Sequence, residues 1–435
     1  MLTAPNAIAF TVQAFVNIAE IWIIGKMGTG ALAAIALSFP FSILIQTMSL
    51  GALGGGISSA VARALGNGDK MRADKILWHA VYLGAAISLV FLIVFLLFGR
   101  PALALLGGEG AVLEAATNYC LILFIGGVFL WLASTISAIF RGAGDMAYPS
   151  RLMVIASFVQ VPLTAIFIFG AFGFPALGVP GAALSSVIIS MVTAGAMVNR
   201  ISFGHCAVRF RRSAMAPDGD VLREILKVSL PAALNPVLNV VIILVLTALV
   251  GRFGASALAG YGIGTRIEFV VLPIMFAFGT AATTLVGTNI GAGQQKRAEL
   301  IGWQAAASAA VFCGAIGSVL AIFPKFWVPF FSADPVAIKV TTNYIQIVGP
   351  AFAFYAVGLV LYFASQGAAA MKWPIRAQIM RCLMAVGGAW LAVDVFNLGV
   401  FSIFAVSTLS LAVYAAIVSA AIYFGAWEPQ KSKRN

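Results

Sequence analysis

A single carboxylate lies in an otherwise apolar stretch near the amino terminus. The stretch VNIAEIWIIGKMG, Val16 to Gly28, places Glu20 among residues typical of hydrocarbon surroundings. Hydrocarbon disfavours the charged form of a carboxylate, so such a group can take up a proton from one side and release it to the other. At 3.6 residues per turn, Gln13, Asn17 and Glu20 share one helix face. The alternative is that Glu20 lies near enough to the helix end to reach interfacial water.

The elements that carry this carboxylate are membrane spans. Of the 435 residues, 62% are hydrophobic and 9% are charged, and the mean hydropathy is +1.03. Apolar runs of about 20 residues recur along the whole chain, which is the pattern of a helical membrane protein rather than of a barrel. We predict twelve spans, at 4–24, 33–62, 76–98, 118–140, 152–172, 181–203, 228–250, 257–288, 300–323, 341–365, 376–397 and 400–425.

The basic residues predict the orientation of these spans. The net charge is +12, and the basic residues that produce it lie in alternate loops between the spans. They do not form the basic patch of a nucleic-acid-binding protein, so we expect no nucleic-acid partner. We assign 20 of the 26 Lys and Arg residues to one set of loops and the tail, among them Arg63, Arg141 and Arg381. Both termini should therefore face the cytoplasm.

The two halves of the chain repeat each other. IGKMGTGALAA from Ile24 aligns with VGRFGASALAG from Val250 at an offset of 226 residues, which also pairs Pro5 with Pro231. RGAGDMAYPSR from Arg141 aligns with QGAAAMKWPIR from Gln366 at an offset of 225. Six spans per half make this a parallel repeat, for which two bundles with a cavity between them and alternating access are typical.

The repeat predicts the domains. The fold class is an all-α polytopic membrane protein with twelve transmembrane helices in two pseudo-symmetric six-helix lobes. The lobes are 1–203 and 228–425, with a cytoplasmic linker at 204–227 and a cytoplasmic tail at 426–435. Met1 aligns with Lys227, so the first half has no counterpart of DGDVLREIL, and either a late start or a true lack of this segment would explain that.

As a set, these motifs resemble the multidrug and toxic compound extrusion (MATE) family of antiporters. The similar features are the Pro at the entry to spans one and seven, the G[KR]xGxxALA turns, RGAGDMAYP, and GFPALGVPGAALSS before span six. The resemblance implies export of amphipathic, often cationic, organic compounds in exchange for protons or sodium ions. It also implies an integral protein of the bacterial inner membrane that embeds in lipid, binds a small organic substrate and needs no cofactor. We expect a monomer.

The resemblance locates the ion-coupling candidates, which are Glu20, Asn17, Gln160 and Thr164. Glu20 lies where the family carries an acidic residue in span one. Gln160 and Thr164 lie one turn apart where proton-type members have Asn and Asp, and the missing Asp leaves Glu20 as the first lobe's carboxylate. A proton is favoured as the coupling ion, but these oxygen ligands also suit sodium. Ordinary interhelical hydrogen bonding is the alternative role for Gln160 and Thr164.

The candidates for a substrate cavity are mostly in the second half: Gln13, Asn235, Asn239, Glu268 and Tyr355. Asn239 and Tyr355 stand where the sodium-type branch has Glu and Asp, which argues against that branch's cation site. Glu268 is either a structural anchor or a second cation-binding group, and at i and i+2 it does not face Arg266.

Four prolines are candidates for helix bending: Pro5, Pro162, Pro231 and Pro236. Pro5 and Pro231 each begin the first span of a repeat. Pro162 and Pro236 lie inside predicted helices, where they remove a backbone hydrogen bond and permit bending, which suits a gate, although a static kink is the alternative for any one of the four.

Other classes of function fit less well. A membrane enzyme needs convergent titratable or metal-binding residues, and the sequence has no HExxH motif and no Ser, His, Asp set, so we expect neither catalysis nor a metal site. A flippase for lipid-linked or polysaccharide intermediates is the alternative within transport, and a cationic cavity would favour it.

Overall fold

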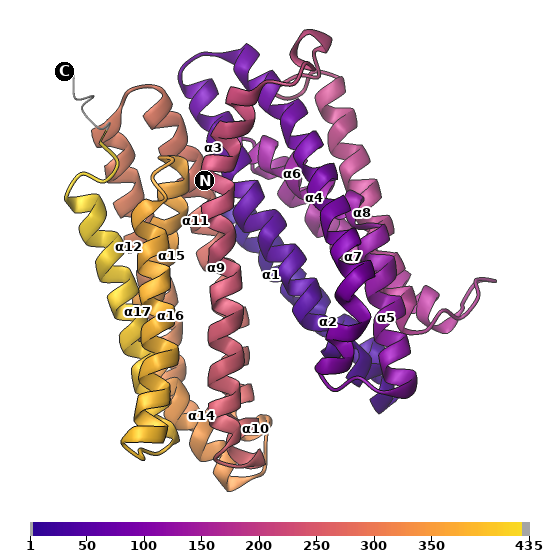
Figure 1. The fold of residues 1–435 in the computed structure, drawn as a ribbon, viewed down its shortest axis with the longest axis vertical. Coiled ribbons are helices and arrows are strands. Elements are labelled where there is room, and N and C mark those ends of the chain that lie inside the picture. The colour runs from indigo at the N-terminus through magenta and orange to yellow at the C-terminus, as the bar shows by residue number, and fades with distance from the viewer. Residues whose placement is uncertain (1–2, 429–435) are drawn as a thin grey trace. The chain divides into compact units, whose positions relative to one another are not determined.

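The computed structural model describes residues 3–428 and divides the chain into two compact units, Met1–Ser229 and Leu230–Asn435 (Figure 1). All regular elements of the described residues are helices. Ten helical segments are long and apolar enough to cross a membrane, and twelve if each of two bent pairs counts as one span. The predicted all-α membrane fold is confirmed.

The first unit is a helical bundle that also includes the linker. Its elements are α1 (Thr3–Gly25), α2 (Thr29–Thr47), η1 (Met48–Leu53), α3 (Gly54–Gly66), α4 (Lys70–Leu105), α5 (Gly110–Ile125), α6 (Gly127–Gly142), α7 (Ala147–Phe169), α8 (Val179–Ser202), η2 (Arg212–Ala214) and the start of α9 (Gly219–Gly251). The linker predicted at 204–227 lies within this unit.

The second unit begins inside α9 and continues with its own bundle. Its further elements are α10 (Ala255–Arg266), α11 (Glu268–Gly291), α12 (Gln295–Ile322), α13 (Pro324–Trp327), η3 (Val328–Phe330), α14 (Pro335–Val348), α15 (Phe352–Gly367), α16 (Lys372–Trp390), η4 (Leu391–Val395) and α17 (Val400–Tyr423). The predicted tail at 426–435 falls largely on residues 429–435, which lie outside the described residues, as do Met1 and Leu2.

Each unit contains one sharply bent span at a matching place in the repeat. α5 and α6 meet at 50°, and α14 and α15 meet at 55°. Gly126 separates the first pair, and Gly349, Pro350 and Ala351 separate the second. Proline has no N–H to donate and so interrupts a helix. A Cβ atom at Gly126 would lie 2.4 Å from the Val187 side chain, and one at Gly349 would lie 2.6 Å from the Gly317 carbonyl oxygen, so both glycines allow close packing at the breaks. The spans predicted at 118–140 and 341–365 are therefore broken.

The glycine-rich segment GALGGGISSA from Gly51 serves helix packing. It runs from η1 into α3, and Gly54, Gly55, Gly56 and Ile57 are buried. A Cβ atom at Gly142 of α6 would lie 2.6 Å from the Ser58 carbonyl oxygen, so α3 and α6 approach at backbone distance. Small residues allow this close approach in membrane bundles.

Candidate functional site

Glu20 meets the predicted partners from α7. Its Oε1 accepts a hydrogen bond from Gln160 Nε2 at 2.8 Å and another from Thr164 Oγ1 at 3.1 Å. Gln160 and Thr164 are buried, with exposed fractions of 8% and 0%. Helices α1 and α7 pack along their length, so residues 140 positions apart in the sequence meet here. The structure thus brings three of the four ion-coupling candidates together.

Two serines of α8 extend this cluster. Gln160 Nε2 also donates to Ser186 Oγ at 3.2 Å, and Ser185 Oγ lies 2.6 Å from Thr164 Oγ1. Both hydroxyls belong to the GAALSS motif that supports the family resemblance, but the sequence analysis gave them no role. The consecutive serines at the start of a span were the available signal. The cluster therefore joins three helices and offers one carboxylate, one amide and three hydroxyls.

Asn17 and Gln13 lie on the same interface between α1 and α7, but at a different height from the Glu20 cluster. Gln13 Nε2 donates to Asn17 Oδ1 at 3.5 Å, and Ser157 Oγ donates to Gln13 Oε1 at 3.4 Å. Further along, Ser150 Oγ donates to Asn6 Oδ1 at 2.6 Å. Asn17 has its hydrogen bond with Gln13 rather than with Glu20. The polar stripe predicted on α1 exists, and Asn6 of α1 with Ser150 and Ser157 of α7 continues it.

The prolines lie inside continuous helices. Pro5 is in the first turn of α1, Pro162 is within α7 next to the Glu20 partners, and Pro231 and Pro236 are within α9. Helix α9 begins at Gly219, so Pro231 lies well inside a helix rather than at its entry. Bending at these positions stays a prediction.

The second unit has a different polar cluster around Arg381. Asn239 Oδ1 accepts from Arg381 Nη1 at 2.9 Å and from Gln378 Nε2 at 3.2 Å. Asn239 Nδ2 donates to Asn235 Oδ1 at 2.6 Å. The Arg381 guanidinium lies 4.8 Å from the ring centroid of Tyr355. Three of the predicted cavity residues therefore surround an arginine that had no predicted role.

The assignment of Arg381 to the cytoplasmic loops is wrong. Arg381 lies within α16, nine residues after Lys372, and is only 9% exposed. Its helix is part of a candidate span, Lys372–Val395. From the sequence, basic residues were assigned to the nearest loop. Because span boundaries predicted from sequence are uncertain by several residues, an arginine a few turns inside a span was assigned to a loop.

Glu268 is anchored by a tyrosine. At the first residue of α11, its Oε1 accepts a hydrogen bond from Tyr344 Oη of α14. Arg266 is exposed, and no ion pair joins it to Glu268. Gln13, the fifth cavity candidate, lies in the first unit, so the structure does not place it with the other four.

Both units carry the pattern of one protein family. The family model MatE matches this chain twice, over residues 5–166 and again over residues 231–391. The chain belongs to the MatE family. The starts of the two matches are 226 residues apart and their ends are 225 apart, which are the offsets of the internal repeat.

Several curated proteins resemble this MatE chain over most of their length. A FAD transporter of Shewanella oneidensis is 27% identical over 84% of this chain and 80% of its own length. The probable multidrug resistance protein NorM of Thermotoga maritima is 25% identical over 82% and 76%. The multidrug export protein MepA of Staphylococcus aureus is 26% identical over 79% and 75%.

Solved structures share the fold. A transporter of the MOP superfamily from Pyrococcus furiosus superimposes with a TM-score of 0.91 at 23% identity, covering 98% of this chain and 95% of its own. A MATE family transporter in an outward-facing conformation gives a TM-score of 0.90 at 23% identity, with the same coverage. This MatE chain is a membrane transporter with two repeated lobes.

The linker of this MatE chain is fastened to the start of α4. Lys75 Nζ pairs with Asp218 Oδ2 at 2.8 Å, and Arg211 Nε pairs with Asp74 Oδ2 at 3.0 Å. The bond from Lys75 holds the pKa of Asp218 below its usual value. His79 Nε2 accepts from the Asp218 backbone N–H at 2.8 Å, which gives a structural role to a histidine that the sequence left unassigned. The segment is therefore anchored by polar contacts rather than loosely tethered.

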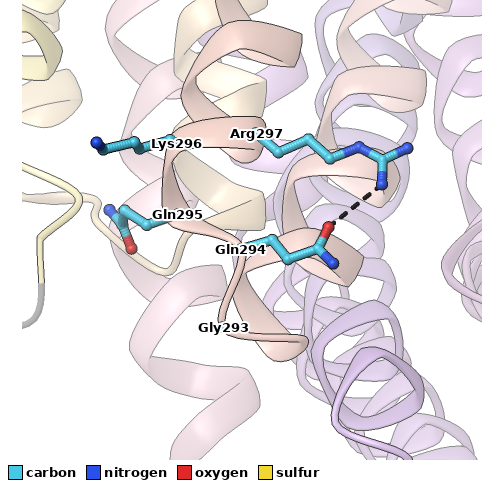
Figure 2. Close-up of a pocket in the computed structure, with 5 residues that line it drawn as sticks. All are labelled: Gly293, Gln294, Gln295, Lys296 and Arg297. Atoms are coloured by element: carbon cyan, nitrogen blue, oxygen red, sulfur yellow. Dashed lines mark hydrogen bonds between the residues drawn. The ribbon is translucent and has the colours of Figure 1, made fainter.

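The turn between α11 and α12 forms an open surface hollow that contains none of the candidates. Figure 2 shows its lining residues Gly293, Gln294, Gln295, Lys296 and Arg297, with Lys296 and Arg297 pointing in opposite directions. Arg297 Nη1 donates to Gln294 Oε1 at 3.3 Å. Within residues 3–428, no group of three His, Cys, Asp or Glu side chains could hold a metal ion.

Proposed function

We propose that the protein is a secondary active antiporter that exports amphipathic organic compounds in exchange for protons or sodium ions by alternating access. The observation that carries this proposal is Glu20, whose carboxylate has hydrogen bonds from Gln160 and Thr164 within a membrane-spanning bundle. Family membership supports transport, and relatives named for multidrug resistance and export support organic substrates.

Glu20 would couple ion movement to substrate movement. An ionisable residue inside a membrane span is costly and usually marks an ion pathway. Its partners Gln160 and Thr164 are neutral, so its negative charge is balanced only when a proton or a cation binds. Binding and release of that ion on opposite sides would complete one cycle. Under this proposal the coupling ion would bind in the first unit.

The proton is the favoured coupling ion because one carboxylate suffices to carry it. The same cluster also offers the oxygens of Thr164, Ser185 and Ser186, and hard oxygen ligands are those that sodium prefers. The protein would lie in a bacterial inner membrane with both termini and the linker on the cytoplasmic side, since most basic loops are predicted there.

Efflux from proteoliposomes tests the proposal. A fluorescent amphipathic compound, used in one experiment as a cation and in another as a zwitterion, would be loaded and its release followed under an imposed pH gradient or an imposed sodium gradient. Native protein should release the fluorescent compound under one of the two gradients. Glu20→Gln should release it at least tenfold more slowly. Glu114→Gln is the matched control, because Glu114 is exposed on α5 and makes the same change of charge. Normal transport by Glu20→Gln would refute the coupling role.

A flippase for lipid-linked or polysaccharide intermediates is the second candidate, and Arg381 is the observation that favours it. Such intermediates carry phosphates, which a buried guanidinium can bind. Failure of both gradients to drive efflux by native protein would place this candidate first.

A further inference from the structure

Arg381 is a buried cation that lacks a carboxylate partner. It lies about 13 Å along α16 from Lys372, at 1.5 Å per residue. No carboxylate oxygen of the described residues lies within 4.0 Å of it, although five such ion pairs occur elsewhere. Glu268 lies within electrostatic range of Arg381, but its carboxylate bonds Tyr344 and not the guanidinium. Buried charges are normally paired by direct contact, so the missing direct partner needs an explanation.

The guanidinium is also incompletely hydrogen-bonded. Nη1 donates to Asn239, but the buried Nε has no hydrogen-bond partner among the described residues. Leaving a buried donor of a charged group unsatisfied is energetically costly. The edge that carries Nε is one of the two edges with which arginine binds an oxyanion through parallel bonds.

Two tyrosine rings hold the guanidinium in place. The ring centroids of Tyr355 and Tyr414 lie 4.8 and 5.8 Å from its central carbon. These rings come from α15 and α17, and α17 packs against both α15 and α16 (Figure 1). Cation–π contacts favour the charge but bring no net negative charge. Arg381 is thus held between the two rings while its Nε has no hydrogen-bond partner among the described residues.

The charged side chains of the two clusters stand at different positions of the repeat. Through the offset of 225 residues, Arg381 corresponds to Ala156 of the first unit. Through the offset of 226, Glu20 corresponds to Leu246 of the second. The first unit therefore carries its half-buried carboxylate where the second has leucine, and the second carries its buried cation where the first has alanine.

We propose that Arg381, together with Asn239 and Gln378, binds an oxyanion of the transported compound, either a carboxylate or a phosphate. The substrates would be amphipathic anions or zwitterions rather than purely cationic compounds, and their apolar parts would pack on Tyr355 and Tyr414. This inference specifies the substrate class of the proposed export function and rests on it, but binding tests it without any ion gradient.

The first test uses two dyes that differ only by a free carboxylate. Rhodamine 110 has that carboxylate, and rhodamine 123 is its methyl ester. Fluorescence anisotropy with the purified full chain in detergent should show about tenfold tighter binding of rhodamine 110. Arg381→Gln should reduce this preference to about one while ester binding is kept. Arg376→Gln, which removes an exposed arginine of the same helix, should keep the preference.

A second variant guards against misfolding of Arg381→Gln. Asn239→Asp places a carboxylate beside Nη1 and so supplies the missing charge from the protein itself. It should fold, bind the ester and lose the preference for the acid. Equal binding of the two dyes by native protein, or a full preference in either variant, would overturn the proposal.

Competition distinguishes the two oxyanions. Benzoate, phenyl phosphate and neutral benzyl alcohol would each be titrated against bound rhodamine 110. Displacement by an anion but not by the alcohol supports the proposal, and the stronger anion identifies the preferred group. Displacement by neither anion, or equal displacement by benzyl alcohol, contradicts it. Absence of gradient-driven efflux would refute the antiport proposal while leaving these binding results intact.

Discussion

The Thr164 hydroxyl lies between Glu20 and the serines of α8. It donates to Glu20 Oε1 at 3.1 Å and lies 2.6 Å from Ser185 Oγ. Thr164→Val keeps the shape of the side chain and removes the hydroxyl. A hydrogen bond to a charged group contributes about 1.5–3 kcal/mol, so we expect gradient-driven efflux to fall about tenfold, as measured in proteoliposomes.

Thr193→Val is the control for Thr164→Val. Thr193 is half-buried on α8, and its hydroxyl bonds the carbonyl oxygens of Ile189 and Ser190 within its own helix. This control should transport normally. Equal loss in both variants would mean that the effect arises from helix stability, and the Thr164 hydroxyl would then have no specific part in coupling.

The sequence predicted the first cluster better than the second. Glu20 was recognisable because a carboxylate in an apolar run is conspicuous, and Gln160 and Thr164 were found through the resemblance to the MATE family. Ser185 and Ser186 were not, because serines in membrane helices often bond their own backbone, as both do with the Ala182 carbonyl. Arg381 was missed because the sequence alone does not distinguish an arginine at the end of a span from one that is buried inside it.

At the scale of elements, backbone contact between helices decides where side chains fit. A Cβ atom at Gly317 of α12 would lie 2.0 Å from the Gly349 carbonyl oxygen, at the break between α14 and α15. Gly317→Ala should lower the free energy of unfolding by about 1–3 kcal/mol or more, because the neighbouring backbone cannot yield cheaply. Thermal unfolding of the purified protein should show a melting temperature several degrees lower.

Gly262→Ala is the matched control for Gly317→Ala. Gly262 lies within α10 of the same unit, and a Cβ atom there meets nothing within 4 Å. Alanine has the higher helix propensity, so this variant should be as stable as the native protein or slightly more stable. A stable Gly317→Ala protein would contradict the close packing of α12 on the break.

The helices themselves were largely predictable, but their breaks were not. Twelve apolar runs correspond to the ten segments and two bent pairs of the structure. Hydropathy averages over about 19 residues and cannot register a bend at Gly126 or at Gly349 and Pro350. The linker was predicted as a polar connection. Its polar contacts with α4 join residues more than 130 positions apart, and the hydrophobic periodicity of the sequence gives no information on such contacts.

At the scale of the whole molecule, the internal repeat was the strongest signal in the sequence. Shared motifs at nearly constant offsets predicted two lobes, and the family model matches the same two stretches. The two polar clusters nevertheless carry different charges, the half-buried carboxylate of Glu20 in the first lobe and the buried guanidinium of Arg381 in the second. Duplication explains the common helix order, and divergence of a few inward positions explains the different chemistry of the two copies.

Orientation in the membrane is the remaining property of the whole molecule, and the distribution of basic residues predicts it. Ser213 lies exposed in the linker, and Glu109 lies exposed between α4 and α5, at the other end of α4 from the residues that hold the linker. In a variant with Cys206 replaced by serine, Ser213→Cys should react with a membrane-impermeant maleimide in inside-out vesicles but not in intact cells. Glu109→Cys should show the opposite labelling pattern. Cys120, Cys313 and Cys382 are buried, so they should not add to the labelling of either variant. Labelling of Ser213→Cys from outside intact cells would reverse the predicted topology, and with it the direction assigned to export.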